Sequence, residues 1–489
     1  MQKVSCPSCG AEVVFRSAAS VMAVCDYCHS TLLKDAESVQ DIGKMASVLE
    51  DYSPIQINTA GVYQDKHFAI VGRIQLRYEA GFWNEWYALF DDASAGWLSD
   101  ASGQYVFTLP QSVPPAAPQF ATLVPGFSLA YGGSRFVAAD VRTARCVAGQ
   151  GELPFRVGSG WEAKVADFRS AGRFLTLDYS EGESPQLYVG RSVDLAELRC
   201  QLLRSADDIA ATAGRFRGKT TALNCPNCGS AIKYQAGMAF HVVCPSCQAE
   251  VDCSTDKALV LQKHEQLARV ITTLALGDIG TIDRVRYEVI GFLKCREVES
   301  DESSEWIEYL LFNDQKGFVW LVESEDRWDR VKVLNLWPDQ ASPTSVGFGG
   351  ERYTKLYQYG SEVIYAAGAF NWRVAVGDRT RITDYGKQGQ KLTAEATDKE
   401  ITWSAATEVP AAQVMQWFAK KVPVRANESA PSGDQRELFR IAVICSIILA
   451  VLNIPILFMA GRDPFENLII PAIVLWLPVW VRGWFAKGS

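Results

Sequence analysis

The sequence predicts a mainly β protein with two modules in tandem, each a zinc ribbon followed by a β-rich unit, and then a C-terminal transmembrane α-hairpin. Three observations predict this class: a cysteine quartet that occurs twice in the 489 residues, strand-like alternation after each quartet, and a strongly apolar C-terminal region. The chain is 48% apolar, which is enough to build several cores and excludes disordered and collagen-like classes.

The tandem arrangement is predicted by an internal repeat. Residues 6–72 align with residues 225–291 without a gap. Farther along the chain the offset drifts, as loops of unequal length require, and Tyr87 then falls on Tyr309. The period is too long for a solenoid, so we interpret the repeat as one duplicated two-part module.

The repeat and the changes in composition set the expected domain boundaries. They are zinc ribbon 1 at residues 1–34, β-rich domain 1 at 35–205, zinc ribbon 2 at 219–255, β-rich domain 2 at 256–422, a flexible linker at 423–437 and the transmembrane hairpin at 438–489.

Most of each β-rich domain should consist of strands. Gly72–Tyr78 alternates apolar and polar residues, which is the pattern of a half-buried strand. Helical periodicity is weaker, and we expect helices at Glu37–Asp51, Asp194–Arg204 and Ala411–Lys421.

The two cysteine quartets are the strongest chemical signal. Each has the pattern Cys-x2-Cys-x15-Cys-x2-Cys, in which two tight turns bring four thiolates to one tetrahedral ion. Four thiolates leave no open coordination position, so the metal should be structural. We predict two structural zinc ions, with iron as the alternative. The ligands are Cys6, Cys9, Cys25 and Cys28 in the first site, and Cys225, Cys228, Cys244 and Cys247 in the second.

Two histidines lie beside the quartets, and we expect His29 and His241 to stay outside the metal coordination. The remaining cysteines have no paired spacing and are expected to be buried as small apolar residues. They are Cys146, Cys200, Cys253, Cys295 and Cys445.

Two charge-free runs near the C-terminus predict the membrane hairpin. Ile441–Gly461 has 21 residues, which is long enough to cross the ~30 Å hydrocarbon core of a bilayer. Asn467–Val481 has 15 residues and two prolines, so a re-entrant or interfacial segment is the alternative there. For the first run the alternative is a buried core helix.

Positive residues flank this hairpin at both ends, with Arg436 and Arg440 before it and Arg482 and Lys487 after it. The positive-inside rule then places both ends in the cytoplasm. We therefore expect a two-pass protein of the inner cell membrane whose large N-terminal region is cytoplasmic. In that reducing compartment the thiols remain available to metal.

The sequence contains no recognised catalytic motif: it lacks a phosphate-binding glycine loop, a Gly-x-Ser-x-Gly elbow and a His-Glu-x-x-His helix. We therefore predict a protein that is not an enzyme. If a β-rich domain has a polar pocket, the repeated polar residues would line it: Arg156, Arg373, Asp167 and Asp384. The repeated aromatic residues would line a ligand groove or pack in a core: Trp83, Trp86, Tyr87, Trp306 and Tyr309.

The ribbon motif Cys-Pro-x-Cys-Gly, followed by a β-rich unit that contains Gly151–Gly158, resembles the bacterial domain-of-unknown-function 4178 family. The resemblance covers residues 1–422, and the second copy departs from it at Gly368–Val374. It implies no established enzymatic activity. It also implies a cytoplasmic partner of bacterial membrane proteins, with an association with envelope stress.

The leading hypothesis is a membrane-anchored scaffold or adaptor that presents its duplicated modules to other, membrane-associated proteins. One alternative is an enzyme or small-ligand sensor that uses a polar pocket in a β-rich domain. Another is a membrane-tethered nucleic-acid binder, suggested by the ribbons and by Arg215, Arg217 and Lys219. The net charge of −8 disfavours nucleic acid as a partner.

Overall fold

The chain divides into two units, residues 1–420 and residues 421–489. The computed structural model describes the first unit apart from short gaps, together with Val443 of the second. The gaps are residues 1, 18, 35–38, 47, 114–116, 158–160, 214–222, 233–240, 254–258, 263–269, 299–303, 326 and 343.

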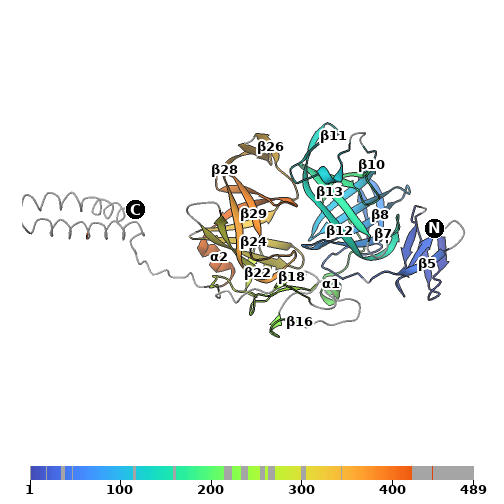
Figure 1. The fold of residues 1–489 in the computed structure, drawn as a ribbon, viewed down its shortest axis with the longest axis horizontal. Coiled ribbons are helices and arrows are strands. Elements are labelled where there is room, and N and C mark those ends of the chain that lie inside the picture. The colour runs from blue at the N-terminus through green and yellow to red at the C-terminus, as the bar shows by residue number, and fades with distance from the viewer. Residues whose placement is uncertain are drawn as a thin grey trace, which may run out of the picture. The chain divides into compact units, whose positions relative to one another are not determined.

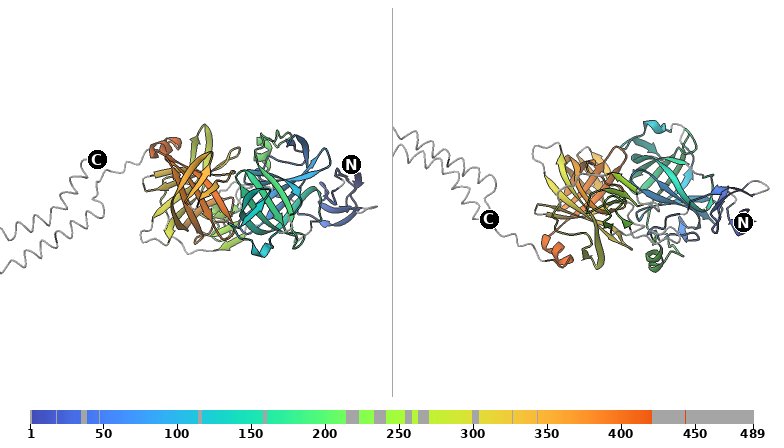
Figure 2. Two further views of the ribbon diagram at one scale, coloured as in Figure 1. Left: turned by 90° about the horizontal axis from the view of Figure 1, so that it is seen from above. Right: turned by 60° about the horizontal axis from the view of Figure 1, so that its bottom comes forward.

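The first β-rich domain is a closed barrel of eight antiparallel strands (Figures 1 and 2). Two four-stranded meanders pair side by side, and the pairing of β7 with β12 closes the ring. Around the ring the strands are β7 (Lys66–Arg77), β8 (Phe82–Phe90), β9 (Ala95–Ala101), β10 (Gln104–Gln111), β15 (Gln186–Val193), β14 (Arg173–Asp178), β13 (Glu162–Ser170) and β12 (Ser134–Leu153).

The second β-rich domain repeats this barrel with the same topology. The pairing of β22 with β28 closes it. Its strands, in ring order, are β22 (Val285–Val298), β23 (Glu305–Asn313), β24 (Gly317–Ser324), β25 (Arg327–Val333), β31 (Ile401–Val409), β30 (Gln390–Ala396), β29 (Arg379–Lys387) and β28 (Glu351–Phe370). The mainly β class and the tandem duplication are confirmed.

Short strands extend both barrels. In the first, β6 (Ala60–Tyr63) pairs with β7 and β11 (Ser128–Tyr131) pairs with β12. In the second, β21 (Ile279–Ile282) pairs with β22, and β26 (Asp339–Ser342) and β27 (Ser345–Phe348) form a hairpin against β28.

Each ribbon continues the sheet of its own barrel. In the first, β3 (Met22–Val24) pairs with β12 and is followed in the sheet by β4 (Ser30–Lys34) and β5 (Val39–Lys44). In the second, β18 (His241–Val243) pairs with β28 and is followed by β19 (Glu250–Asp252) and β20 (Leu259–Gln262). A separate hairpin carries the first cysteine pair: β1 (Gln2–Ser5) with β2 (Glu12–Phe15), and β16 (Leu223–Asn224) with β17 (Ala231–Ile232).

Apolar clusters lie on the outer faces of both barrels, and a further one joins the second ribbon to lumenal residues such as Leu293 and Cys295. On β8, Trp86, Ala88 and Phe90 point outward and pack against Ile55 and Leu198, which flank the barrel in sequence. In the second barrel the short helix α2 (Ala411–Trp417) covers the corresponding face. Because the strand period is 2, the residues between these outward positions face the lumen.

Two of the three expected helices are wrong. Residues 39–44 form β5, because pairing with β4 overrides their weak helical pattern. Residues 194–204 form turns, and the helix α1 (Ala206–Thr212) begins only after them, with Ser205 as its N-cap. The helix expected at Ala411–Lys421 is present as α2.

Among the residues that the structure describes, no helix has the length and apolar character needed to cross a bilayer. The runs predicted to span the membrane, Ile441–Gly461 and Asn467–Val481, lie outside the described residues except for Val443.

Each barrel closes at a pair of glycines whose backbones nearly touch. A Cβ on Gly72 of β7 would lie 1.8 Å from the carbonyl oxygen of Glu152 on β12, and a Cβ on Gly151 would lie 2.3 Å from that of Val71. Gly151 also has a φ of +71°, which disfavours any other residue. The second barrel repeats the pair with Gly291 and Gly368.

We predict that Gly72→Ala destabilises the chain by about 1–3 kcal/mol, because the added methyl must displace backbone. Urea denaturation of the full chain measures the effect. Gly347→Ala is the matched control, because the nearest atom to its added Cβ lies 3.9 Å away. Equal unfolding midpoints for the two variants would show that the closure tolerates a side chain.

Candidate metal centres and barrel lumens

The two cysteine quartets come together as predicted. Cys6 Sγ lies 3.6 Å from Cys28 Sγ, and Cys9 Sγ lies 3.7 Å from Cys25 Sγ. In each quartet all four sulfurs lie within 4.8 Å of one another. A tetrahedral ion with metal–sulfur bonds of ~2.3 Å requires sulfur–sulfur edges of about 3.8 Å. Each cluster therefore fits one metal ion.

The second cluster repeats this geometry, with 3.6 Å between Cys225 Sγ and Cys247 Sγ and 3.8 Å between Cys228 Sγ and Cys244 Sγ. In both clusters the first and third cysteines are buried, and the second is exposed. The four positions of a tetrahedron are filled by thiolates, so the clusters are suited to a structural ion.

Tight turns present the thiolates of each pair. The N–H of Gly10 donates to the carbonyl of Cys6 at 2.8 Å, and that of Gly229 donates to the carbonyl of Cys225 at 2.8 Å. Both glycines have positive φ, +77° and +74°. The glycine of the repeated Cys-Pro-x-Cys-Gly therefore suits the left-handed backbone of this turn.

One thiol in each cluster has a pKa below the ordinary value, which favours its metal-binding form. Hydrogen bonding to Ser30 lowers the pKa of Cys28 to about 6, and hydrogen bonding to Ser230 does the same for Cys228. The Sγ–Oγ distance is 3.3 Å in both pairs. The thiolate is the form of cysteine that binds metal.

The histidines near the quartets are not part of either cluster. The Nε2 atom of His241, on β18, lies 2.9 Å from the carbonyl oxygen of Val374, and the ring is buried. His29 takes a positive φ of 57° in the turn after Cys28. The expectation that both stay outside the coordination is confirmed among the described residues.

A buried carboxylate attaches the first ribbon to its barrel. Glu152 of β12 accepts hydrogen bonds from the N–H groups of Arg16 at 2.7 Å and Ser17 at 3.0 Å, and it pairs with the Arg16 guanidinium at 3.2 Å. These charge-assisted bonds link the metal-binding unit to the strand that closes the barrel.

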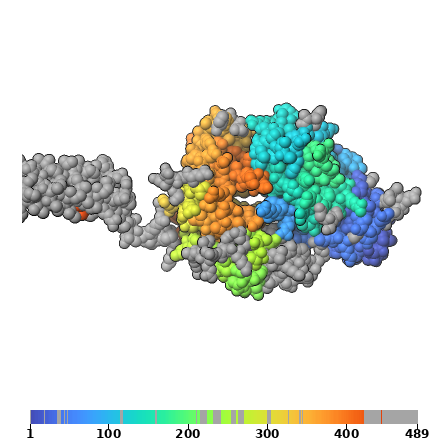
Figure 3. Space-filling model, in the orientation of Figure 1, coloured from blue at the N-terminus to red at the C-terminus, as the bar shows by residue number. Residues whose placement is uncertain are grey.

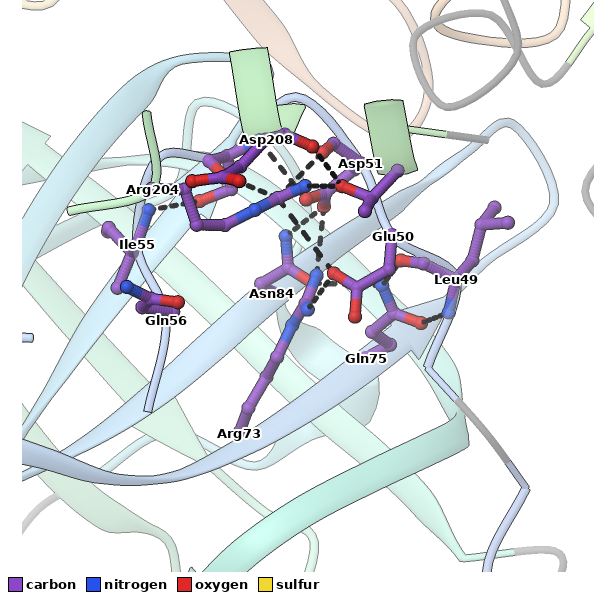
Figure 4. A network of polar contacts seen from close by, with 12 residues as sticks. Leu49, Glu50, Asp51, Ile55, Gln56, Arg73, Gln75, Asn84, Arg204 and Asp208 are labelled. Atoms are coloured by element: carbon purple, nitrogen blue, oxygen red, sulfur yellow. Dashed lines mark hydrogen bonds and ion pairs between the residues drawn. The ribbon is translucent and has the colours of Figure 1, made fainter. Parts of the chain in front are cut away.

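A second polar network, shown in Figure 4, fixes the segment before the first barrel against its outer face. Arg73 is 2% exposed; it donates to Asn84 Oδ1 at 3.0 Å and to Asp51 Oδ2 at 3.1 Å, and its Nη1 lies 3.7 Å from Glu50. Arg204 donates to the backbone carbonyl of Asp51 at 2.9 Å. These groups satisfy one another, so we interpret the network as structural.

The lumen of the first barrel is polar. Glu85 of β8 accepts hydrogen bonds from Trp83 Nε1 and Ser99 Oγ, both at 2.7 Å. Burial, followed by the charges of Asp167 and Asp178 on the opposite wall, raises the pKa of Glu85 to about 8. Glu85 lies between outward-facing positions of β8 such as Trp86, so its side chain points inward.

The second lumen repeats the motif. Trp306 Nε1 donates to Glu308 at 2.7 Å, and Thr393 Oγ1 donates to Asp384 at 2.6 Å, as Thr176 does to Asp167 at 2.7 Å in the first barrel. Burial raises the pKa of Glu308, and burial together with the charge of Glu308 raises that of Glu395 to about 8.

The second lumen opens into a hollow of about 2160 Å³ whose lining also includes many residues of the first barrel and of the segments around it. The mouth of this hollow lies at the border of the blue and orange surfaces in Figure 3. Its lumenal lining includes valines, Val322, Val331 and Val333. It also includes Cys295, Trp306, Glu308, Trp320, Asp329, Tyr359, Asp384, Lys391, Thr393, Glu395, Thr402 and Ser404.

The polar residues singled out from the sequence divide into two groups. Asp167 and Asp384 face the lumens, and Asp384 is 1% exposed. Arg373 instead forms ion pairs with Glu79 at 3.2 Å and Glu250 at 3.5 Å, although it also borders the hollow. Arg156 is exposed.

The sequence alignment of the aromatic residues was wrong by one position. The strand register makes Trp86 the equivalent of Tyr309, since they pair with Arg73 and Phe292, and Trp83 the equivalent of Trp306. In a strand a one-residue slip exchanges the two faces. The aligned motif is Trp-x-Glu, and its glutamates were missed because the slip separated them.

These features define a class of protein: two closed eight-stranded barrels in tandem, each continuous with a ribbon whose four cysteines could hold a metal ion. The chain belongs to the family described as domain of unknown function (DUF4178), whose model matches residues 56–195 and 275–411. No curated protein and no solved structure matches the chain.

We predict that Cys6→Ser and Cys225→Ser each remove one metal ion per chain, because three thiolates and a hydroxyl hold the ion far less tightly. Elemental analysis of the purified full chain measures the stoichiometry. Cys146→Ser is the matched control, since Cys146 lies outside both clusters. Retention of both ions in Cys6→Ser would contradict the assigned ligands.

Proposed function

We propose that the chain is a small-ligand-binding protein that acts at a membrane surface, with its ligand site in the lumen of the second barrel. The observation that carries the proposal is the hollow into which the lumen of this barrel opens, where carboxylates and aromatic rings lie among valines. Eight-stranded barrels have an interior that is either filled by side chains or wide enough for one small ligand. This favours the sensor alternative over the scaffold as the primary role.

The proposed role is not enzymatic. The thiol that lies beside a lumenal carboxylate, Cys295 next to Glu308, is held neutral because burial raises its pKa well above the ordinary value, so it is not an activated nucleophile. We propose that the metal ions are zinc and structural, with iron as the alternative that the elemental analysis also tests.

We predict that Thr402→Trp, which fills the lumen opposite Glu395, abolishes ligand binding. Ligand-observed NMR of the full chain against a set of small polar cations, anions and neutral compounds measures binding. Arg381→Trp is the matched control, because Arg381 is exposed on the neighbouring strand β29. Absence of binding to wild type, or equal binding to both variants, would refute the lumenal site.

We also propose that residues 438–489 anchor the chain in the inner membrane as a two-pass hairpin, with the barrels and the C-terminus in the cytoplasm. The support is the length of the charge-free run Ile441–Gly461 and the positive residues on both sides of the hairpin. Residues 423–437 would act as a flexible linker.

Protein binding by the ribbons is a second candidate role, in which the chain is an adaptor, with envelope stress as the expected context. The specific observation is Tyr27, a large aromatic side chain that is 78% exposed in the turn between Cys25 and Cys28. Exposed tyrosines are enriched at interfaces. A nucleic-acid role has less support because the net charge is −8. The basic residues Arg215, Arg217 and Lys219 lie outside the described residues.

We predict that the full chain sediments with membranes and resists a carbonate wash, whereas a chain ending at residue 437 stays in the supernatant with both metal ions bound.

Crosslinking in those membranes tests the adaptor role, and Tyr27→Ala should reduce the amount of crosslinked partner protein. A full chain released by carbonate would refute the anchor, and adducts unchanged by Tyr27→Ala would refute the ribbon contact.

A further inference from the structure

We propose that the ligand of the second barrel is a small organic cation that carries N–H donors, a guanidinium or a primary ammonium, bound by Glu395 and Glu308. This inference rests on the proposed function and names the chemical class of its ligand. The argument compares the two barrels residue by residue, because the duplication makes the first an internal reference for the second.

In the first barrel the lumenal carboxylates have donors of their own. Ser99 Oγ donates to Glu85 at 2.7 Å, and the N–H of Ser180 donates to Asp178 at 2.8 Å. A guanidinium is also enclosed: Arg169 donates to Ser192 Oγ at 3.0 Å and lies over the ring of Phe174. This lumen satisfies its own polar groups.

In the second barrel those donors are missing. The strand register places Val322 where the first barrel has Ser99, because each lies opposite the glutamate of the Trp-x-Glu motif. Glu308 keeps Trp306 and gains only the thiol of Cys295, a weak donor. Glu395 stands where the first barrel has Asp178, and no described group donates a hydrogen bond to it.

The charges of the second lumen are also unbalanced. Lys391 lies 3.5 Å from Asp329 and 3.7 Å from Asp384, so this one ammonium is shared by two carboxylates. The charge of the same Lys391 also acts on Glu308 and Glu395, so one ammonium faces four lumenal carboxylates among the described residues. The position of Arg169 is occupied by Gly386, so the first barrel's guanidinium has no counterpart there.

An independent observation points to an absent ligand. The hydroxyl of Ser404 is 3% exposed and has no hydrogen-bond partner among the described residues. Ser404 lies opposite Thr393, whose own hydroxyl binds the lumenal Asp384, and it lines the hollow. A buried hydroxyl left unpaired costs about 1–3 kcal/mol, which a ligand polar group would recover.

The arrangement fits an organic cation better than a metal ion. Magnesium and calcium need several oxygens converging at about 2.0–2.6 Å. Among the described residues, only the two cysteine quartets bring three or more potential ligand atoms within 4.8 Å of one another. The lumenal acids are more widely spread, and Trp306 and Tyr359 stand beside them with ring centroids 6.0 Å apart. Aromatic faces attract organic cations.

Isothermal titration calorimetry of the full chain with methylguanidinium, ethylammonium and tetramethylammonium tests the proposal, with glucose and succinate as the neutral and anionic arms. We expect the first two to bind, and tetramethylammonium, which has no N–H donor, to bind at least tenfold more weakly. Glu395→Gln should weaken binding by on the order of tenfold, the equivalent of about 1.4 kcal/mol.

Two further variants make the test specific. Asp178→Asn, the matched change in the first barrel, should leave binding unchanged, and Val322→Ser, which restores the missing hydroxyl donor, should weaken it. Binding of glucose or succinate without the cations would overturn the cation and leave the lumenal site standing. Binding of the cations unaffected by Glu395→Gln would overturn the assigned residues, and binding of no probe would overturn the cation class. Circular dichroism and metal content confirm that each variant is folded.

Discussion

The close approach of two glycines is the constraint on which each module depends. Gly151 pairs with Gly72 of β7 on one side and with Val24 of β3 on the other. The same backbone position therefore closes the barrel and receives the ribbon. Gly368 does this in the second module, between Gly291 and Val243. Without a Cβ at these crossings three strands can meet, and no other residue type allows that distance.

Each closed barrel carries carboxylates and other polar side chains on its inner face. The outer faces carry large apolar clusters that neighbouring segments of the chain cover, so the lumens need not supply all of the apolar core. A lumen freed from that task can hold carboxylates. The two copies differ in this respect: Ser99 donates to the lumenal glutamate of the first barrel, and Val322 stands at the equivalent position of the second.

The sequence was sufficient for the parts of the structure that rest on local spacing. Cys-x2-Cys turns are local, so the eight ligands and the tandem repeat were predictable, and Ala411–Trp417 was recognisable as a helix. Barrel closure was not predictable, because β7 and β12 are far apart in sequence and no periodicity encodes their pairing. Residues 39–44 became a strand only because β4 lies beside them.

The lumenal site was missed for a related reason. Asp384 was selected because it is repeated. Glu308 was not selected, since a one-residue slip in the alignment placed it opposite Trp86. Glu395 was not selected either. Only the hydrogen-bond register identifies which residues share a face. The repeated tryptophan two residues before each glutamate was the available signal.

The order of elements at the end of the first unit has a mechanical consequence. Lys420 follows α2 closely, and α2 is a short helix held by Val414, Met415 and Phe418, with the Phe418 ring packed over Gly280 of β21. Tension transmitted through the chain after Lys420 therefore reaches this helix before any barrel strand. Beyond it lies β31, hydrogen-bonded on both sides within a closed ring. The helix would detach at low force. The barrel would unfold only when the hydrogen bonds of β31 to both β25 and β30 break together.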